Sequence, residues 1–365
     1  MATTMKAFVV DSTTKVGIVD RQRAVPKVQK NQLLVKPISV ALNPTDWRSL
    51  DGGRAKPGCI VGCDYAGEVV AVGEDAAKQN KWKAGDKVYG CTQGSNFVDP
   101  DDGIFAEYGV VLADLQMKLS DNSVGFDGAA TIPLGAITVG QGLFQKAMKL
   151  ELPDVTTAAN PPARDIAVLI YGGGTATGAL GIQFGRLAGY KVITTCSPSN
   201  FEYVKSLGAD HVVDYHDANA GQQIRDLTNN KLYHAWDTVS VPASAQICAD
   251  ALSTDVATQK PRYGALLPTK CPREDVESTF TVMYTSFGKT FMFGADLAMP
   301  ASAEDFAFAK TFYALTEKLV AAGLIKPHTY RVEQGGLDGI TEGLAKLKEG
   351  KVKAEKLVYR LADTK

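Results

Sequence analysis

A run of glycines and threonines near the middle of the chain has the composition of a phosphate-binding turn. Residues 172–178, Gly-Gly-Gly-Thr-Ala-Thr-Gly, follow the apolar segment 168–171 and precede a helical pattern. Glycines in this context allow a tight bend and close approach of the backbone to a pyrophosphate at the helix N-terminus. The pattern predicts a dinucleotide-binding turn. Its contacting residues would be Gly173, Thr175, Ala176, Thr177 and Gly178.

The turn departs from the G-x-G-x-x-G fingerprint at one position. Residue 175 is a threonine, so only Gly173 and Gly178 occupy fingerprint positions. The hydroxyl groups of Thr175 and Thr177 would then donate to the phosphate in place of a backbone approach. A glycine-rich turn that merely joins a strand to a helix is the alternative interpretation.

The residues after the next predicted strand discriminate between the two nicotinamide cofactors. Domains that prefer NAD carry an acidic residue there, which binds the ribose 2′-hydroxyl. Residues 194–200 read Thr-Thr-Cys-Ser-Pro-Ser-Asn, and the first carboxylate is Glu202. Hydroxyl and amide groups accept a 2′-phosphate, which a carboxylate would repel. We therefore expect NADPH, although no arginine accompanies these groups and Asn200 also fits a plain helix N-cap.

The elements around this turn alternate between strands and helices, which predicts a doubly wound parallel sheet. Short apolar runs predict strands at 166–170, 191–195, 211–213, 235–239 and 263–267. Helical spacing predicts helices at 178–188, 200–207, 218–227 and 303–322. After Gly323 we expect a strand at 329–332, a helix at 337–348 and a last strand at 356–361. The first third of the chain, in contrast, reads as short strands broken by Gly, Pro and Asn, typical of a β-barrel or sandwich.

The bulk composition restricts the classes of function. A chain of 365 residues predicts two domains. A net charge of -1 without runs of like charge argues against nucleic-acid or membrane partners and favours small-molecule chemistry. The six cysteines are dispersed, so we expect reduced thiols. Without a long apolar stretch or a signal-peptide pattern, we expect a cytoplasmic protein.

Several motifs in order resemble the medium-chain dehydrogenase/reductase superfamily, in its quinone oxidoreductase and enoyl reductase branch. They are Asn-Pro-Thr-Asp at 43–46, the glycine-bounded strand at 62–73, Gly-Asp-Lys-Val at 85–88, and the turn at 172–178. Segments 171–177 and 195–201 and the proline-bearing loop 152–164 are most similar to fungal trans-acting enoyl reductases of polyketide synthases, of the lovastatin type. This resemblance implies a GroES-like β-barrel substrate domain (1–135 plus 325–365) and a Rossmann cofactor domain (136–324).

The residues that bind zinc in alcohol dehydrogenases of the superfamily are replaced in this chain. Asn43-Pro44-Thr45 stands where those enzymes have a cysteine ligand, and Cys63-Asp64 replaces a His-Glu pair. A catalytic zinc needs three converging protein ligands, so we expect no metal. Cys63 and Cys91 are then interpreted as buried packing residues. The four histidines (211, 216, 234 and 328) show no metal-binding spacing.

The resemblance also implies which side chains meet the ligands. Around the cofactor it places Thr45, Trp47, Arg48, Ser197, Pro198, Ser199, Asn200, Tyr215, Leu267, Lys353 and Ala354, in addition to the turn. Around the substrate it places Thr138, Val139, Phe291 and Phe293. Three of these side chains have simpler alternatives: Tyr215 as a ring packed on the sheet edge, and Phe291 and Phe293 as parts of a buried strand.

The expected reaction is an NADPH-dependent reduction of an α,β-unsaturated acyl thioester carried by a separate polyketide synthase. Without zinc, hydrogen bonds must stabilise the enolate, and Arg48 is the candidate catalytic residue. Its high pKa makes it a poor proton donor, so water is a candidate proton source. A surface arginine paired with Asp46 or Asp51 is the alternative for Arg48. The alternative functions are a quinone or small-enone oxidoreductase and a catalytically idle NADPH-binding scaffold.

Overall fold

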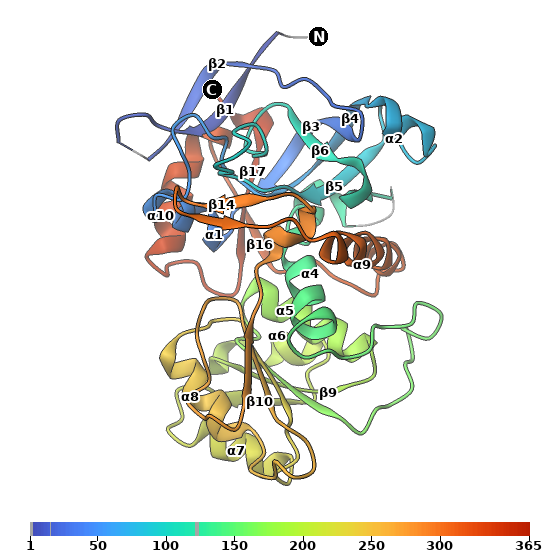
Figure 1. The fold of residues 1–365 in the computed structure, drawn as a ribbon, viewed down its shortest axis with the longest axis vertical. Coiled ribbons are helices and arrows are strands. Elements are labelled where there is room, and N and C mark those ends of the chain that lie inside the picture. The colour runs from blue at the N-terminus through green and yellow to red at the C-terminus, as the bar shows by residue number, and fades with distance from the viewer. Residues whose placement is uncertain (1–2, 15, 121–123) are drawn as a thin grey trace. The chain divides into compact units, whose positions relative to one another are not determined.

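The computed structural model describes residues 3–14, 16–120 and 124–365, and the chain divides into two compact units (Figure 1). The first unit comprises Met1–Leu134, Tyr284–Ala321 and Pro327–Lys365. The second comprises Gly135–Met283 and Ala322–Lys326. Each unit has its own sheet and its own buried core.

The first unit is built on a seven-stranded sheet in the order β16-β17-β3-β4-β5-β7, with β6 also paired to β3. Its strands are β3 (Gln32–Ala41), β4 (Asp64–Val72), β5 (Lys87–Cys91), β6 (Gly109–Leu112), β7 (Met117–Lys118), β16 (Tyr330–Glu333) and β17 (Lys356–Arg360). Two small antiparallel pairs accompany it: β1 (Thr4–Val10) with β2 (Gly17–Ala24), and β14 (Phe291–Phe293) with β15 (Leu297–Met299).

The long strand β3 organises this sheet. Its first half pairs with β6 through residues 32–35, its last residues 39–41 pair with β17, and β4 runs along its whole length. The register with β4 shifts on both sides of Pro37, which has no N–H to donate to a ladder. One strand thereby changes partners midway on one edge, which places β17 across β3 from the start of β4.

The helices of the first unit are short except for α9. They are α1 (Pro44–Asp51), α2 (Glu74–Lys78), α3 (Gly125–Ala129), α9 (Ala303–Ala321) and α10 (Ile340–Lys348). Helix α1 starts with proline at its first position, where the missing N–H costs nothing, after an extended Asn43. Within the described ranges no helix is both long and apolar enough to cross a bilayer.

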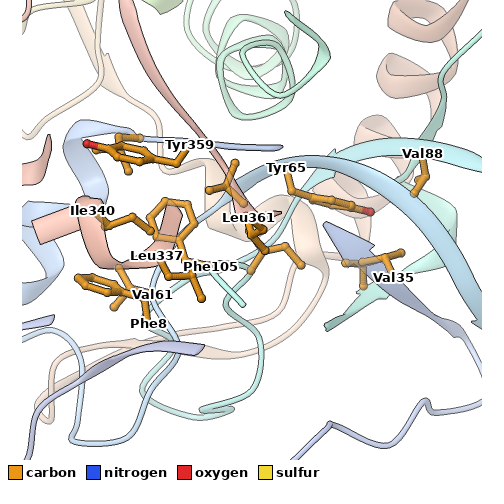
Figure 2. Close-up of a cluster of buried hydrophobic side chains, with 14 of the residues drawn as sticks. Phe8, Val35, Val61, Tyr65, Val88, Phe105, Leu337, Ile340, Tyr359 and Leu361 are labelled. Atoms are coloured by element: carbon orange, nitrogen blue, oxygen red, sulfur yellow. The ribbon is translucent and has the colours of Figure 1, made fainter. Parts of the chain in front are cut away.

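The core of the first unit joins residues from both ends of the chain. Figure 2 shows Phe8, Val61 and Phe105 beside Leu337, Ile340 and Tyr359, together with Tyr65 and Leu361. Phe105, Leu337 and Ile340 are completely buried. Burying a large apolar side chain contributes about 1.5–3 kcal/mol, so this cluster anchors the C-terminal segment on the N-terminal sheet.

The second unit contains a six-stranded parallel sheet in the order β10-β9-β8-β11-β12-β13. The strands are β8 (Ala167–Tyr171), β9 (Lys191–Cys196), β10 (His211–Asp214), β11 (His234–Asp237), β12 (Arg262–Ala265) and β13 (Glu277–Phe280). The helices are α5 (Ala176–Leu187), α6 (Phe201–Ser206), α7 (Ala220–Leu227) and α8 (Pro242–Ala251), and α4 (Pro133–Val139) leads into the unit. This strand order is that of the doubly wound dinucleotide-binding fold, in which the order reverses between β8 and β11.

All five strands predicted in this unit are present, with ends displaced by one or two residues. The sixth strand, β13, was not predicted, because its alternation of half-buried and exposed residues gives no apolar run. Parallel strands buried on both faces read as continuous apolar segments, whereas an edge strand such as β13 does not.

The predicted boundary of the cofactor domain differs from the observed units at 284–321. This segment was expected in the same domain as 136–283, but it belongs to the first unit. Glu317 of α9 accepts the backbone N–H of Lys118 at 2.9 Å, and Tyr313 Oη lies 2.9 Å from Cys91 Sγ. Helical periodicity predicted α9 correctly, but it does not say against which sheet a helix packs.

Candidate active site

The predicted phosphate-binding turn joins β8 to α5 in the second unit. Gly172 has a φ of +85°, a left-handed conformation that glycine adopts without strain. A Cβ atom on Gly178 would lie 2.2 Å from the carbonyl oxygen of Gly172, so the helix start and the turn approach too closely for any side chain. The first N–H groups of α5 have no partner within the helix, which suits a pyrophosphate.

The hydroxyl of Thr175 is engaged within the protein. It accepts the N–H of Gly178 at 2.9 Å as the N-cap of α5, and it lies 2.9 Å from the hydroxyl of Thr238. Thr238 in turn donates to the carbonyl of Tyr171 at 2.8 Å. The ends of β8 and β11 are thus tied together where the strand order reverses, which is where open α/β sheets bind ligands. Thr175 therefore shapes the turn, and its predicted contact with a phosphate stays a prediction.

A hydroxyl pair lies after β9, where cofactor preference is decided. Ser197 Oγ lies 3.3 Å from Tyr215 Oη. The ring of Tyr215 is 37% exposed and packs on the imidazole of His216 at 4.1 Å, while the nearby carboxylate of Asp214 is paired with His216 at 2.7 Å. Asn200 precedes α6, but its side chain makes no capping hydrogen bond. The geometry therefore does not support a simple N-cap role for Asn200.

The remaining predicted residues are distributed over both units. Leu267, Thr138 and Val139 lie in the second unit, with the side chain of Val139 fully buried. Lys353 and Ala354 precede β17 in the first unit, where Ala354 has a φ of +52°. Pro198 and Ser199 are exposed in a 3₁₀ turn after β9.

Helix α1 presents three of the predicted ligand contacts in the first unit: Thr45, Trp47 and Arg48. The guanidinium of Arg48 lies 5.2 Å from the centre of the Trp47 ring. Burial lowers the pKa of Arg48, and the neighbouring Arg54 lowers it further. The alternative of a surface ion pair is not observed among the described residues, since Asp51 pairs with Lys348 at 2.5 Å and Asp46 is buried.

Helix α1 contains a buried carboxyl group. Asp46 is 2% exposed; its Oδ2 accepts the N–H of Asn43 at 2.7 Å, and its Oδ1 has no hydrogen-bond partner in the described part of the chain. Burial raises the pKa of Asp46 to about 7, and the negative charge of Asp64 adds to this effect. Asp46 therefore titrates near neutral pH in the folded protein.

A second buried carboxylate, Asp64 at the start of β4, forms an internal ion pair. Its Oδ2 accepts from Lys356 Nζ at 2.5 Å and from Asn43 Nδ2 at 2.9 Å, and its Oδ1 accepts the N–H of Leu134 at 2.8 Å. The side chains of Lys356 and Asp64 are 3% and 0% exposed. These contacts occupy both oxygens of Asp64.

These residues do not fit the catalytic zinc of alcohol dehydrogenases. The ammonium group of Lys356 is paired with Asp64, and it would repel a dication placed beside that carboxylate. Cys63 and Cys91 are 1% exposed, as interpreted from the sequence, and burial raises the pKa of both thiols. A thiol must lose its proton to bind zinc, so this burial works against metal binding.

Beside this cluster, a small recess opens in the first unit. Eight residues from α1 to β14 line it: Ser49, Arg54, Gln93, Gly94, Ser95, Tyr284, Met292 and Phe293. Tyr284 Oη lies 2.5 Å from Thr45 Oγ1, and the Tyr284 ring packs edge-on against Phe291 and Phe293. Phe291 is fully buried in β14, as its strand alternative predicted, whereas Phe293 lines the recess.

Four residues of this arrangement were not among the candidate site residues of the sequence analysis: Asp46, Asp64, Tyr284 and Lys356. The two aspartates lie inside motifs that were recognised, so their position was a usable signal. Tyr284 and Lys356 lie in segments that match no functional motif. Tertiary structure brings Tyr284 to Thr45 and Lys356 to Asp64.

The comparisons with known proteins agree with this architecture. Residues 29–121 match the family Alcohol dehydrogenase GroES-like domain, and residues 176–255 match the family Zinc-binding dehydrogenase. A solved alcohol dehydrogenase superfamily protein from Novosphingobium aromaticivorans aligns with a TM-score of 0.76 at 23% identity, over 98% of this chain and 99% of its own. The predicted pairing of a GroES-like domain with a Rossmann sheet is confirmed.

Relatives of known sequence are closer. Trans-enoyl reductase resD of Aspergillus sclerotiorum is 40% identical over 369 residues, which cover 98% of this chain and all of that protein. Trans-enoyl reductase TOXD of Cochliobolus carbonum is 44% identical over 289 residues, 79% of this chain and 92% of its own. The fold takes a nicotinamide cofactor. The chain belongs to the trans-enoyl reductases of the medium-chain dehydrogenase/reductase superfamily.

Proposed function

We propose that this enzyme uses NADPH to reduce an α,β-unsaturated acyl thioester carried by a separate polyketide synthase. The observation that carries the proposal is the 40% identity to a trans-enoyl reductase along essentially the whole of both chains. The aligned span covers the segments that contain the cofactor turn and α1. Quinone or small-enone reduction is the competing function, because it would use the same cofactor.

The preference for NADPH is supported by the side chains after β9. Ser197 and Tyr215 bring two hydroxyl groups within 3.3 Å of each other, and no carboxylate occurs from 197 to 201. Hydroxyl groups donate to a 2′-phosphate, and hydrogen bonds to charged groups contribute about 1.5–3 kcal/mol each. The nearest carboxylate on the sheet, Asp214, is turned to His216.

The proposed roles of the chain's own groups follow from their positions. When bound, the cofactor supplies a hydride to the β-carbon of the substrate. The start of α5 and the turn at Gly172 would hold the pyrophosphate. Arg48, which forms no ion pair with a described carboxylate, would stabilise the enolate oxygen by a charge-assisted hydrogen bond. An enolate needs donors of this kind, and the cluster around Asp64 offers no metal site to replace them.

A three-substrate comparison tests the proposal. The rate of NADPH oxidation would be measured with an enoyl chain on a carrier domain, with a free quinone and with a free small enone. We expect the carrier-bound chain to be preferred, and a free short enoyl thioester to react with a larger KM because it lacks the high local concentration that tethering provides. Efficient quinone reduction with an untouched enoyl thioester would establish the competing function. No NADPH oxidation with any of them would point to an idle scaffold.

A further inference from the structure

The recess in the first unit contains one side chain suited to donate a proton to carbon. Of its eight lining residues, only Arg54 and Tyr284 carry a dissociable proton on an ionisable group. The guanidinium of Arg54 lies over the ring of Phe293 and that of Arg48 over the ring of Trp47, and a guanidinium keeps its charge and acts as an anion-binding group. The phenol of Tyr284 is therefore the candidate donor.

The surroundings of this phenol prepare it for such a step. Tyr284 is 8% exposed, and burial raises its pKa well above the usual value, so it holds its proton at neutral pH. Cys63 and Asp46 add to this rise, and the hydroxyl of Thr45, 2.5 Å away, opposes it by stabilising the phenolate. Thr45 in turn lies in α1, three residues before Arg48, the proposed enolate-binding group.

Two further features support a polar ligand in the recess. Ser95 is 5% exposed, and its hydroxyl lacks a hydrogen-bond partner in the described structure, an arrangement that a bound polar group would satisfy. The guanidinium of Arg54 lies over the ring of Phe293 at 5.2 Å, and no carboxylate of the described residues pairs with it. Phe293 and Met292 add an apolar wall, as an acyl chain requires.

We propose that Tyr284 donates the proton to the α-carbon of the reduced thioester, with Thr45 as its hydrogen-bond partner. This inference rests on the proposed enoyl reduction. In the step, the enolate carbon forms a C–H bond, the O–H bond of Tyr284 breaks, and the negative charge moves to the phenolate. The phenolate then takes a proton from water. The net reaction consumes one hydride from the cofactor and one solvent proton.

The decisive variant is Tyr284→Phe, which removes one oxygen atom and keeps the ring packed against Phe291. General acid catalysis contributes about 10²–10⁴-fold, so we expect kcat for crotonyl-coenzyme A to fall by that factor. A second readout follows the fate of the proton. In D₂O the wild-type enzyme should place deuterium on one face of the α-carbon. The residual product of the variant should carry it on both faces, while hydride still adds to one face of the β-carbon.

Matched controls separate chemistry from folding. Tyr313→Phe also removes a buried phenolic oxygen in the first unit, where Tyr313 contacts Cys91 outside the recess, and it should leave kcat and stereochemistry unchanged. Thr45→Val should lower kcat, and Thr45→Ser should restore it. Thermal unfolding and NADPH binding of Tyr284→Phe should match those of the wild type.

The outcomes are distinguishable. A folded Tyr284→Phe enzyme with wild-type kcat and a single α-configuration overturns the inference and leaves the proposed function intact. A wild-type enzyme that does not reduce the enoyl thioester overturns both. Loss of kcat with scrambled α-deuterium and retained NADPH binding supports Tyr284 as the donor.

Discussion

Removing the ammonium group of Lys356 should destabilise the first unit strongly. The substitution Lys356→Met keeps the length and apolar character of the side chain but leaves Asp64 without its countercharge at a position with no exposed surface. The carboxylate still accepts hydrogen bonds from two donors, Asn43 Nδ2 and the N–H of Leu134. Breaking a buried ion pair on one side costs about 3–5 kcal/mol, because the remaining charge is buried without compensation.

A double-mutant cycle measures how much of this cost belongs to the pair. We expect Asp64→Asn alone to be destabilising as well, since it leaves the ammonium group unpaired. Combining it with Lys356→Met removes both charges, while the amide still offers an acceptor to the N–H of Leu134. The double variant should therefore be more stable than either single variant, because replacing a whole buried pair is often nearly neutral.

The assay is equilibrium unfolding in urea at pH 7, with the unfolding of the first unit followed by its tryptophans. A cost of 3–5 kcal/mol would change the unfolding constant by about two to three and a half powers of ten, since each 1.4 kcal/mol is tenfold. If Lys356→Met costs less than about 1 kcal/mol, as exposed ion pairs do, the reasoning from burial is wrong. Simple additivity of the two single variants in the double variant would refute the coupling.

Three further predictions concern single positions. The pKa of Asp46 is raised in the folded state to about 7, so its stabilising contribution is complete below the unfolded value near 3.8 and is lost as the pH rises through 7. The free energy of unfolding of the wild type should therefore fall by up to about 4 kcal/mol between pH 4 and pH 8, because the pKa differs by about three units at 1.36 kcal/mol each, and Asp46→Asn should abolish this fall. If wild type and variant differ in unfolding free energy by the same amount at pH 4 and pH 8, the prediction is contradicted. Ser197→Asp should weaken NADPH binding by about 10–100-fold and spare NADH, as two titrations would show, and indifference of both affinities would exclude Ser197 from the phosphate site. Gly178→Ala should cost about 1–3 kcal/mol and impair cofactor binding because of the 2.2 Å approach to Gly172; unchanged melting and affinity would show that the turn relaxes freely.

The fold of the second unit was predictable because its signals are local. Strands β8 to β12 are mostly apolar segments, and the glycine turn at 172–178 marks the end of β8 and the start of α5. Each of these patterns involves residues within one element or its immediate neighbours. The sequence also predicted the first unit as a β-rich domain completed by the C-terminal segment, whose Leu337 and Ile340 lie beside Phe8 in Figure 2.

The grouping of 284–321 with the first unit could not be read from the sequence, for the opposite reason. Its helix and its strands were readable, but their partners lie far away in the sequence: Tyr284 contacts Thr45, and Tyr313 contacts Cys91. Hydrophobic periodicity identifies a face that must be buried, not the surface that buries it.

The sequence by itself indicated the strands and helices of the second unit and the cofactor turn, since these depend on residue types at fixed local spacing, and the resemblance to the superfamily implied the replacement of the zinc ligands. Only the tertiary structure decided what fills the replaced site. Lys356 and Asp64 are separated by 292 positions, yet they form one buried pair because the C-terminal half of β3 has β17 on one edge and the start of β4 on the other. Charge compensation in a protein interior depends on distances between atoms, and the order of residues along the chain does not contain them.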